Sequence, residues 1–215
     1  ELGSREGMCD ENQNEIRRMR PGDSRMDISR IYEESWKSAY KGIVPQAYLD
    51  SIPNGHWAPH LDQPGWHTLI CVDEGRAIGT TSFCESRFQQ FPSWGEIISL
   101  YLLPEYAGQG YGKALLEAAL CELKQLGFRD IFLWVLEENH HARLFYEKMG
   151  FNVSDAFLED QIGGKPLREV QYTYRLPDCV VRPSKAGDKH STDGADDGGA
   201  EREPGREDVW SCQYS

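Results

Sequence analysis

The stretch of sequence that decides the fold is LYLLPEYAGQGYGKALLEAAL, residues 100–120. Its apolar run ends at a proline, glycines follow at Gly108, Gly110 and Gly112, and a segment with a leucine-rich helical face begins directly after them. Glycine lets backbone N–H groups approach a ligand closely, and the N-terminus of a helix carries a partial positive charge. The order of strand, glycine turn and helix therefore predicts a phosphate-binding site.

Two other nucleotide-binding turns do not fit the spacing of these glycines. A Walker loop requires glycine, four residues, and then Gly-Lys-Ser/Thr, but here Ala107 replaces the first glycine and Ala114 replaces the hydroxyl residue. A Rossmann turn requires Gly-x-Gly-x-x-Gly, and its third glycine would fall on Lys113 or Leu115. A glycine-rich connection that binds no ligand remains the alternative for this turn taken alone.

On either side of the turn, segments with the apolar periodicity of helices alternate with segments that have the apolar pattern of strands. Together they predict a mixed α/β domain, with Asp27 as the N-cap of the first helix. Helical spacing of apolar residues occurs at 28–40, 45–52, 115–126 and 139–149. Runs that are typical of strands occur at 15–19, 67–72, 76–84, 96–103, 131–136, 151–157 and 170–176.

The composition excludes several classes of function. The formal net charge is −12, which argues against a nucleic-acid-binding protein and favours, weakly, a cationic substrate. No apolar run approaches the ~20 residues of a membrane span, so no membrane association is expected. The six cysteines form no Cys-x-x-Cys pair and no Cys/His cluster with metal-ligand spacing. We therefore expect no metal site, free thiols and a reducing, cytoplasmic compartment.

The composition also divides the chain into three parts. Residues 1–14 are polar and lack periodicity, so we interpret them as disordered or artificial. Residues 15–183 are expected to form the folded domain. Residues 184–215 are rich in Ser, Gly, Asp and Glu, which predicts an acidic, disordered tail.

Three segments of the chain resemble the GNAT superfamily of acyl-CoA N-acetyltransferases. In the acyl-CoA signature of that family, an apolar strand and a proline precede Arg/Gln-x-x-Gly-x-Gly/Ala, and Gly110 and Gly112 match it, with Ala107 at its first position. The run ENHHARLFYEKMGF, 138–151, resembles the family's Asn-x-x-Ala-x-x-x-Tyr-x-x-x-Gly-Phe segment. The run WKSAYKGIVP, 36–45, is similar to a common bacterial subset of the family.

This resemblance covers about residues 15–176 and implies a fold and an activity. The implied fold has a central, mixed but mostly antiparallel sheet with helices on both faces, and the sheet splays beside the glycine turn. The implied activity is transfer of an acetyl group from acetyl-CoA, as co-substrate, to a primary amine of a small molecule or a protein. Candidate acceptors are an aminoglycoside, a polyamine, an amino acid or a protein amine.

Other functions stay open at this point. Because Ala107 departs from the signature, a non-catalytic module that binds acyl-CoA for regulation is an alternative to an enzyme. A nucleotide-binding kinase is disfavoured by the failed Walker spacing. The sequence also leaves open whether two copies of the chain associate as a homodimer.

The resemblance assigns cofactor binding to the turn, to the strand before it and to a later helix. Leu102 and Leu103, through their backbone only, would pair with the pantetheine arm like an added strand. Asn139 would contact the arm, and its alternative is a plain helix cap. Lys113 could reach a phosphate, and its alternative is a solvated residue of the first turn. The residues assigned to the turn are Gly108, Gln109, Gly110, Tyr111, Gly112 and Lys113.

Two residues are assigned to catalysis. Tyr146 matches the tyrosine of the family, which as a protonated phenol would donate to the departing thiolate, and its alternative role is packing in the core. Glu96 begins the strand that leads into the turn and would accept the proton of the amine, directly or through water, whereas an exposed charge at a strand end is its alternative. A water chain without a protein base is a further possibility. Weaker candidates for the base are Glu137, Glu85 and His67.

Aromatic residues are frequent in the segments that, by the resemblance, would line the acceptor pocket. Most of them are expected in the core, with one or two shaping the pocket. They are Trp36, Tyr40, Tyr48, Trp57, Trp66, Phe88, Phe91 and Trp94.

Overall fold

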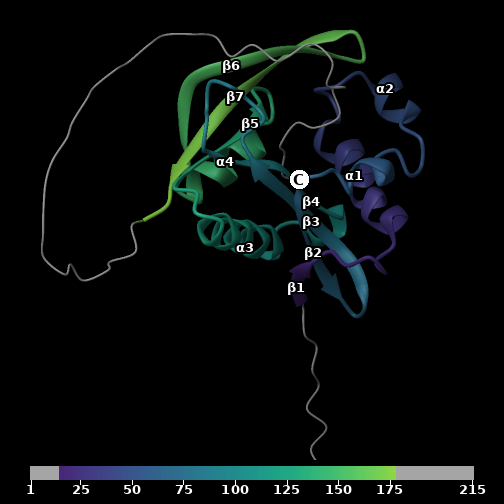
Figure 1. Cartoon of the computed structure of the whole chain (residues 1–215). Coiled ribbons are helices and arrows are strands. Elements are labelled where there is room, and N and C mark those ends of the chain that lie inside the picture. Colours follow the sequence, from purple (N-terminus) through teal and green to yellow (C-terminus); the bar gives the residue numbers. More distant parts are fainter. Residues whose placement is uncertain (1–14, 178–215) are drawn as a thin grey trace, which may run out of the picture.

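The computed structural model describes residues 15–177, so the segment 1–14 and the tail 184–215 lie outside the described residues. The described residues form a seven-stranded sheet with helices on both of its faces (Figure 1). In chain order the elements are β1 (Glu15–Arg18), α1 (Arg25–Ala39), α2 (Gln46–Ser51), η1 (Ala58–His60), β2 (His67–Asp73), β3 (Arg76–Glu85), β4 (Gly95–Leu102), η2 (Pro104–Tyr106), α3 (Tyr111–Gln125), β5 (Asp130–Leu136), α4 (His140–Lys148), β6 (Asn152–Ile162) and β7 (Lys165–Arg175).

The strands lie in the order β1-β2-β3-β4-β5-β7-β6. Every neighbouring pair in this sheet is antiparallel except β4 and β5, which are parallel. The predicted mixed, mostly antiparallel sheet is therefore confirmed. The parallel pair is joined through α3, because parallel strands need a crossover connection.

β4 and β5 part soon after they meet. They pair only at Gly95 with Ile131 and at Glu96 with Phe132. Directly after Glu96 the register between β3 and β4 shifts, and Ile98 is left opposite no residue, as a β-bulge. A bulge bends its strand and increases the local twist, so β4 turns away from β5 at this point. The predicted splay of the sheet is confirmed. After the strands part, β4 continues to the glycine turn.

Helices α1 and α3 cover opposite faces of β3 and β4 (Figure 1). On one face the Tyr32 hydroxyl of α1 is hydrogen bonded to Ser99 Oγ at 2.9 Å. On the other face α3 approaches so closely that a Cβ atom built on Gly79 would lie 2.9 Å from Leu115 Cδ1. Glycine at position 79 therefore permits the close packing of α3 on β3.

The β6–β7 hairpin connects the far end of the sheet with α2 (Figure 1). A Cβ atom on Gly163, in the hairpin turn, would lie 2.6 Å from Tyr48 Cβ. Lys165 Nζ donates to the carbonyl of Ile43, 122 residues away, at 2.8 Å. The hairpin and the α1–α2 segment are thus fixed to each other on the face that α1 covers.

The structure corrects the predicted bounds of the last two strands. Each is 11 residues long, and the turn between them contains Gly163 and Gly164, both with positive φ. The prediction stopped at 157 because β6 is an edge strand whose side chains are mostly exposed, which leaves only a weak apolar alternation. The residues 158–162 and 165–169 are therefore strand that apolar periodicity does not predict.

The N-cap of α1 is also corrected. Ser24, rather than Asp27, caps the helix, and its Oγ accepts from the Asp27 N–H at 3.2 Å. Asp27 lies in the first turn instead, where a negative charge is favourable next to the positive end of the helix.

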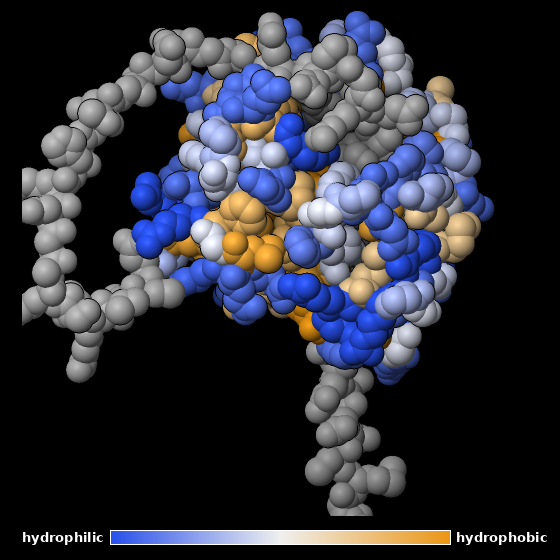
Figure 2. Space-filling view, in the orientation of Figure 1, coloured by the Kyte–Doolittle hydropathy of each residue, from blue (hydrophilic) through white to orange (hydrophobic). Residues whose placement is uncertain are grey.

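The surface on the side shown in Figure 2 is mainly hydrophilic, in keeping with the charge of the chain. Apolar residues on this side gather over α3 and α4. Leu144 of α4 has the highest exposed fraction, 55%, among the large apolar side chains of the described part.

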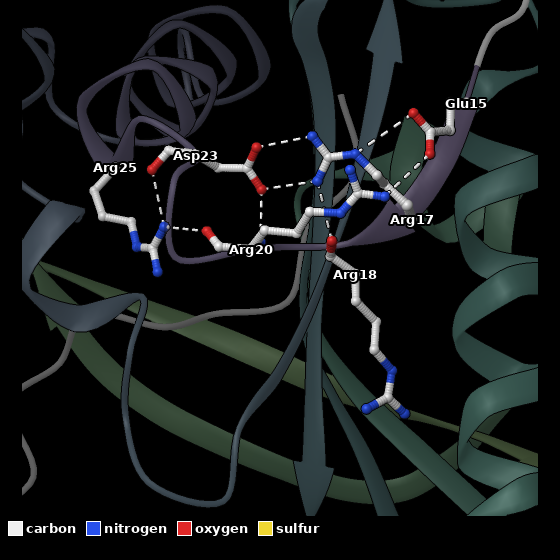
Figure 3. A network of polar contacts seen from close by, with 6 residues as sticks. All are labelled: Glu15, Arg17, Arg18, Arg20, Asp23 and Arg25. Carbon is white, nitrogen blue, oxygen red and sulfur yellow. Dashed lines mark hydrogen bonds and ion pairs between the residues drawn. The ribbon is translucent and has the colours of Figure 1, made fainter.

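A polar network fixes β1 to the start of α1 (Figure 3). The Arg17 guanidinium donates to both carboxylate oxygens of Asp23 at 2.8 Å, and the Arg20 N–H donates to Oδ2 at 2.6 Å. Arg25 donates to the carbonyls of Arg20 and Asp23, both at 2.9 Å. The hydrogen bonds from Arg17, together with its charge, lower the pKa of Asp23 from 3.8 to about 2.

Replacing Asp23 should show how much this network contributes to stability. The folded-state pKa lies below the ordinary value, so the contribution is complete above about pH 4 and is lost as the pH falls toward 2. We expect Asp23→Asn to cost about 1–2 kcal/mol at pH 7, or ~2–8 °C of Tm. The difference from wild type should shrink during acid titration followed by circular dichroism.

Asp62→Asn is the matched control. Asp62 also binds an arginine, Arg25, but its side chain is 58% exposed compared with 17% for Asp23. Solvent screens such an exposed pair, so its loss should change the Tm much less. Equal effects of both variants at pH 7 would contradict the role given to the Asp23 network.

Candidate active site

The glycine turn leaves open space in front of α3. Gly108 and Gly110 have φ of +74° and +94°, and a Cβ atom on either would meet no atom within 4 Å. Gly110 is the N-cap of α3 and has no side chain with which to cap the helix. The first N–H groups of α3 therefore receive no side-chain cap from this residue, and such groups are suited to bind an anion.

Three side chains of the turn have partners within the protein. Gln109 Nε2 donates to the carbonyl of Glu105 at 2.8 Å, and the Tyr111 ring packs against Tyr106. Lys113 forms an exposed pair with Glu117 at 3.8 Å, as its alternative role as a solvated residue predicts. The groups of the turn that remain for an anion are therefore backbone N–H groups and the helix end, and the alanine at position 107 leaves these unchanged.

The backbone groups of Leu102 and Leu103 are partly used within the protein. The Leu103 N–H donates to the carbonyl of Ile78 at 2.8 Å, and the Leu102 carbonyl accepts from Ser35 Oγ. The Leu103 N–H is therefore already bonded to the residue before Gly79 in β3, and pairing of a pantetheine arm with the other backbone groups of Leu102 and Leu103 stays a prediction. Both leucine side chains are fully buried, as expected.

Asn139 has the helix-cap role that the sequence left open, and its contact with a cofactor arm stays a prediction. It is the N-cap of α4, and its Oδ1 accepts from the Ala142 N–H at 3.1 Å. The side chain is buried, and its Nδ2 has no hydrogen-bond partner among the residues that the structure describes. A buried donor without a partner is costly, so this atom fits a contact with the polar arm of an acyl-CoA.

Tyr146 lies on the same helix, with its side chain fully buried. Its ring centroid is 5.6 Å from that of Phe151 and 6.3 Å from that of Tyr172. This is the burial that the packing role requires, so the general-acid role stays a prediction. Tyr172 binds Arg143 and Glu147 through its hydroxyl, and burial raises its pKa.

Glu96 is a buried ion-pair partner. Its side chain is only 1% exposed, so the alternative of an exposed charge at a strand end is wrong. Arg87 donates to it from three groups: its N–H and Nε to Oε2, both at 3.0 Å, and Nη2 to Oε1 at 2.5 Å. Sequence reasoning missed Arg87, because a single arginine in a loop nine residues earlier carries no signal of its partner.

The two predicted catalytic side chains lie on opposite faces of the sheet. Glu96 is the register partner of Phe132 in the parallel pair, so both point to the same face. Tyr146 packs on Tyr172, whose register partner on β5 is Leu133. Since Phe132 and Leu133 are consecutive on one strand, their side chains point to opposite faces. The sheet is interrupted at the gap between β4 and β5, which pair at only two register positions.

The weaker candidates for the base lie on three different segments. Glu85 is exposed at the end of β3, and Glu137 is exposed beyond β5. His67 is on β2, two strands from β4, and stacks on Phe83 with a centroid separation of 5.5 Å. Burial lowers the pKa of His67, but its position excludes direct contact with a substrate held between β4 and β5.

The aromatic residues divide into two groups. Trp36, Tyr40 and Trp57 belong to the main core around α1, as expected for most of them. A second, smaller cluster lies on the Glu96 face, and we call it the aromatic cluster. It consists of Phe88, Phe91, Trp94, Phe132, Trp134 and Leu158, with Ala156 packed against it. Three of the predicted pocket aromatics are therefore gathered on the face where Glu96 lies.

Two further findings concern metals and membranes. Between residues 15 and 177, no group of three or more His, Cys, Asp or Glu side chains could hold a metal ion. Within the same range, no helix has both the length and the apolar character needed to cross a bilayer.

Comparison with known proteins identifies the family to which this arrangement belongs. Residues 27–151, more than half of the chain, match the acetyltransferase (GNAT) family. The uncharacterized N-acetyltransferase YuaI of Bacillus subtilis is 32% identical over 148 residues, which are 67% of this chain and 83% of that protein. The ribosomal protein bS18-alanine N-acetyltransferase of Haemophilus influenzae is 42% identical over 129 residues, 60% of this chain and 77% of that protein.

A solved structure has the same fold. The PaiA N-acetyltransferase of Thermoplasma acidophilum, crystallised in complex with coenzyme A, superposes with a TM-score of 0.60. The match covers 76% of this chain and 99% of that one, with 24% sequence identity. From the matched family, the splayed sheet and the open glycine turn, we conclude that the chain belongs to the GNAT family of acetyltransferases.

Proposed function

We propose that the chain transfers an acetyl group from acetyl-CoA to a primary amine of a small molecule or a protein. The observation that carries this proposal is the parting of β4 from β5 directly before an open glycine turn at the N-terminus of α3. This arrangement provides an anion-binding helix end and, beside it, a strand edge along which an extended arm can lie.

The residues present fit acetyl-CoA. Backbone N–H groups of the 108–112 turn and of the first turn of α3 would hold the pyrophosphate, and Asn139 Nδ2 would donate to the arm. Acetyl-CoA supplies the acetyl group as an activated thioester. The chain itself would position this group between β4 and β5, where both faces of the sheet can be reached.

Glu96 and Tyr146 would move protons on either side of this gap. Glu96 would accept the proton of the attacking amine, directly or through water, while Arg87 fixes the orientation of its carboxylate. Tyr146 would give its phenolic proton to the leaving thiolate from the opposite face. This division lets the amine approach from one face of the sheet and the leaving group depart toward the other.

The acceptor is a cationic amine in this proposal. The net charge of −12 favours attraction of such a substrate. The relative that is 42% identical is named for acetylation of an alanine of a ribosomal protein, which makes a protein amine one candidate. A non-catalytic acyl-CoA-binding module would bind acetyl-CoA without releasing thiol in the presence of any amine.

Acetyl-CoA should raise the Tm of the chain. At a concentration of 100 times Kd the stabilisation is about 2.7 kcal/mol. We expect Gly110→Ala to lose most of this shift, because its Cβ would occupy the open space in front of α3. Differential scanning calorimetry with and without millimolar acetyl-CoA measures both effects.

Gly164→Ala serves as the control. Gly164 has a positive φ of +79°, and a Cβ on it also meets no atom within 4 Å, but it lies in the β6–β7 turn. It should carry the same backbone strain and keep the full shift. No shift in the wild type, or equal shifts in both variants, would contradict the binding site at the turn.

Tyr146→Phe should lower turnover by about 10²–10⁴ if Tyr146 is the general acid. The ring and its packing remain, so the loss of stability should stay within about 1.5 kcal/mol, the contribution of one hydrogen bond. Thiol release gives the turnover and thermal melting gives the stability. Tyr172→Phe, which removes the hydroxyl of the neighbouring ring, should leave turnover nearly unchanged. If Tyr146→Phe keeps more than about half of the activity, Tyr146 is only a packing residue.

Glu96→Gln tests the base through its pH profile. Removal of a base should lower kcat/KM by about 10²–10⁴ at neutral pH, where the amine carries a proton. Activity should recover toward pH 10, where the free amine needs no base. If the rate falls by the same factor at every pH, Glu96 acts only through its ion pair with Arg87, and the proposed base is refuted.

A further inference from the structure

Two buried donors on the Glu96 face have no partner. Trp134 Nε1 on β5 and Gln171 Nε2 on β7 make no hydrogen bond to any residue that the structure describes. Both side chains are 2% exposed. Buried polar groups are nearly always hydrogen bonded in folded proteins, so two such donors indicate a missing partner.

The two residues that carry these donors lie next to each other. Trp134 and Gln171 are register partners on neighbouring antiparallel strands, so their side chains leave the sheet side by side on one face. That face is the Glu96 face, because Trp134 lies two residues after Phe132, the register partner of Glu96. The donors are therefore on the side from which, under the proposed function, the amine approaches.

The chemistry of the missing partner follows from the atoms. An indole N–H can only donate. The amide oxygen of Gln171 accepts from Ser154 Oγ at 2.7 Å, which leaves the NH₂ group of Gln171 to face a partner. Two donors on neighbouring residues require an acceptor, and in a substrate this is an oxygen atom. A polyamine at neutral pH carries only donors and cannot satisfy them.

The charges nearby favour a neutral oxygen over a carboxylate. The guanidinium of Arg87 is already bound by Glu96. Glu169, the register partner of Leu136, adds a second buried carboxyl group on the same face. A substrate carboxylate would meet these groups unfavourably, whereas a protonated amine next to an uncharged carbonyl would not.

We propose that Trp134 and Gln171 bind the carbonyl oxygen of an amide next to the reactive amine. The substrate class is then a peptide N-terminus or an amino-acid amide, and the two residues determine specificity. This inference rests on the proposed function, since it names the substrate of the same site. Phe88 packs against Trp134 at a centroid distance of 5.5 Å, so the loop between β3 and β4 forms the cover of this subsite.

A matched panel of amines tests the inference. Thiol release from acetyl-CoA is measured with alaninamide, with an alanyl tripeptide, with free alanine, with sec-butylamine, which lacks the carbonyl, and with spermidine. We expect kcat/KM for alaninamide and the tripeptide to exceed that for sec-butylamine and spermidine at least about tenfold. Free alanine should resemble sec-butylamine. Equal rates for sec-butylamine and alaninamide would overturn the inference while the proposed function stands. A preference for free alanine would also overturn it, because the group that the two donors bind would then be a carboxylate and not an amide.

Two variants assign the effect to the donors. Trp134→Phe keeps an aromatic ring and Gln171→Met keeps the length of the side chain, and each removes its donor. Each should lower kcat/KM at least about tenfold for alaninamide and less than twofold for sec-butylamine. Trp94→Phe makes the same change elsewhere in the aromatic cluster. It should change kcat/KM by the same factor for alaninamide and for sec-butylamine. A uniform loss with both amines would show a structural role only and would refute the assignment.

A binding measurement separates failure of the inference from failure of the function. If no amine in the panel is acetylated, the proposed function fails. The subsite is then judged by the Tm in the presence of coenzyme A: alaninamide should raise it for the wild type and not for Trp134→Phe, and sec-butylamine should raise it for neither. The absence of any shift with alaninamide in the wild type would overturn the inference as well.

Discussion

The parting of β4 from β5 is the constraint on which the rest of the structure depends. Two parallel strands held by only two register pairs leave backbone groups that an uninterrupted sheet would satisfy. The β-bulge at Ile98 makes this possible, because it turns β4 away just after Glu96. The next elements of the chain, the glycine turn and α3, then begin at the end of the diverging strand. One local distortion thus provides both a strand edge, along which the proposed cofactor arm can lie, and a helix end for its phosphates.

The same distortion explains why the candidate site uses both faces of the sheet. A continuous sheet would separate Glu96, on the face of α1, from Tyr146, on the face of α4. Where the strands part, a group lying between them can be reached from both sides. The β6–β7 hairpin holds the segments on one face of the sheet together. Lys165 donates to the carbonyl of Ile43 and so fixes the hairpin to the α1–α2 segment. The Glu96 face is therefore enclosed by segments far apart in the sequence.

Much of the fold could be predicted from local sequence, and much of the site could not. The glycine turn, α3 and the buried strand β5 follow from periodicity and from residues whose conformational needs are local. The edge strand β6 was underestimated, because its exposed side chains produce little alternation. The partners of Glu96 and Leu103 could not be predicted, since Arg87 and Ile78 come close only after β3 and β4 pair. Asn139 was predicted well, because capping is itself a local interaction.

Buried polar groups connect the remaining features of the Glu96 face. A buried ion pair such as that of Glu96 with Arg87 rarely stabilises a fold more than apolar residues of the same volume would. An unpaired buried donor such as Trp134 Nε1 lowers stability outright. The core around α1 also contains a buried carboxylate, that of Glu33, but this group accepts from Ser29 Oγ and from the Gly55 N–H. Sequences retain such groups most readily where a substrate completes them, so the polar groups of the Glu96 face support the proposal that the acceptor binds on that face.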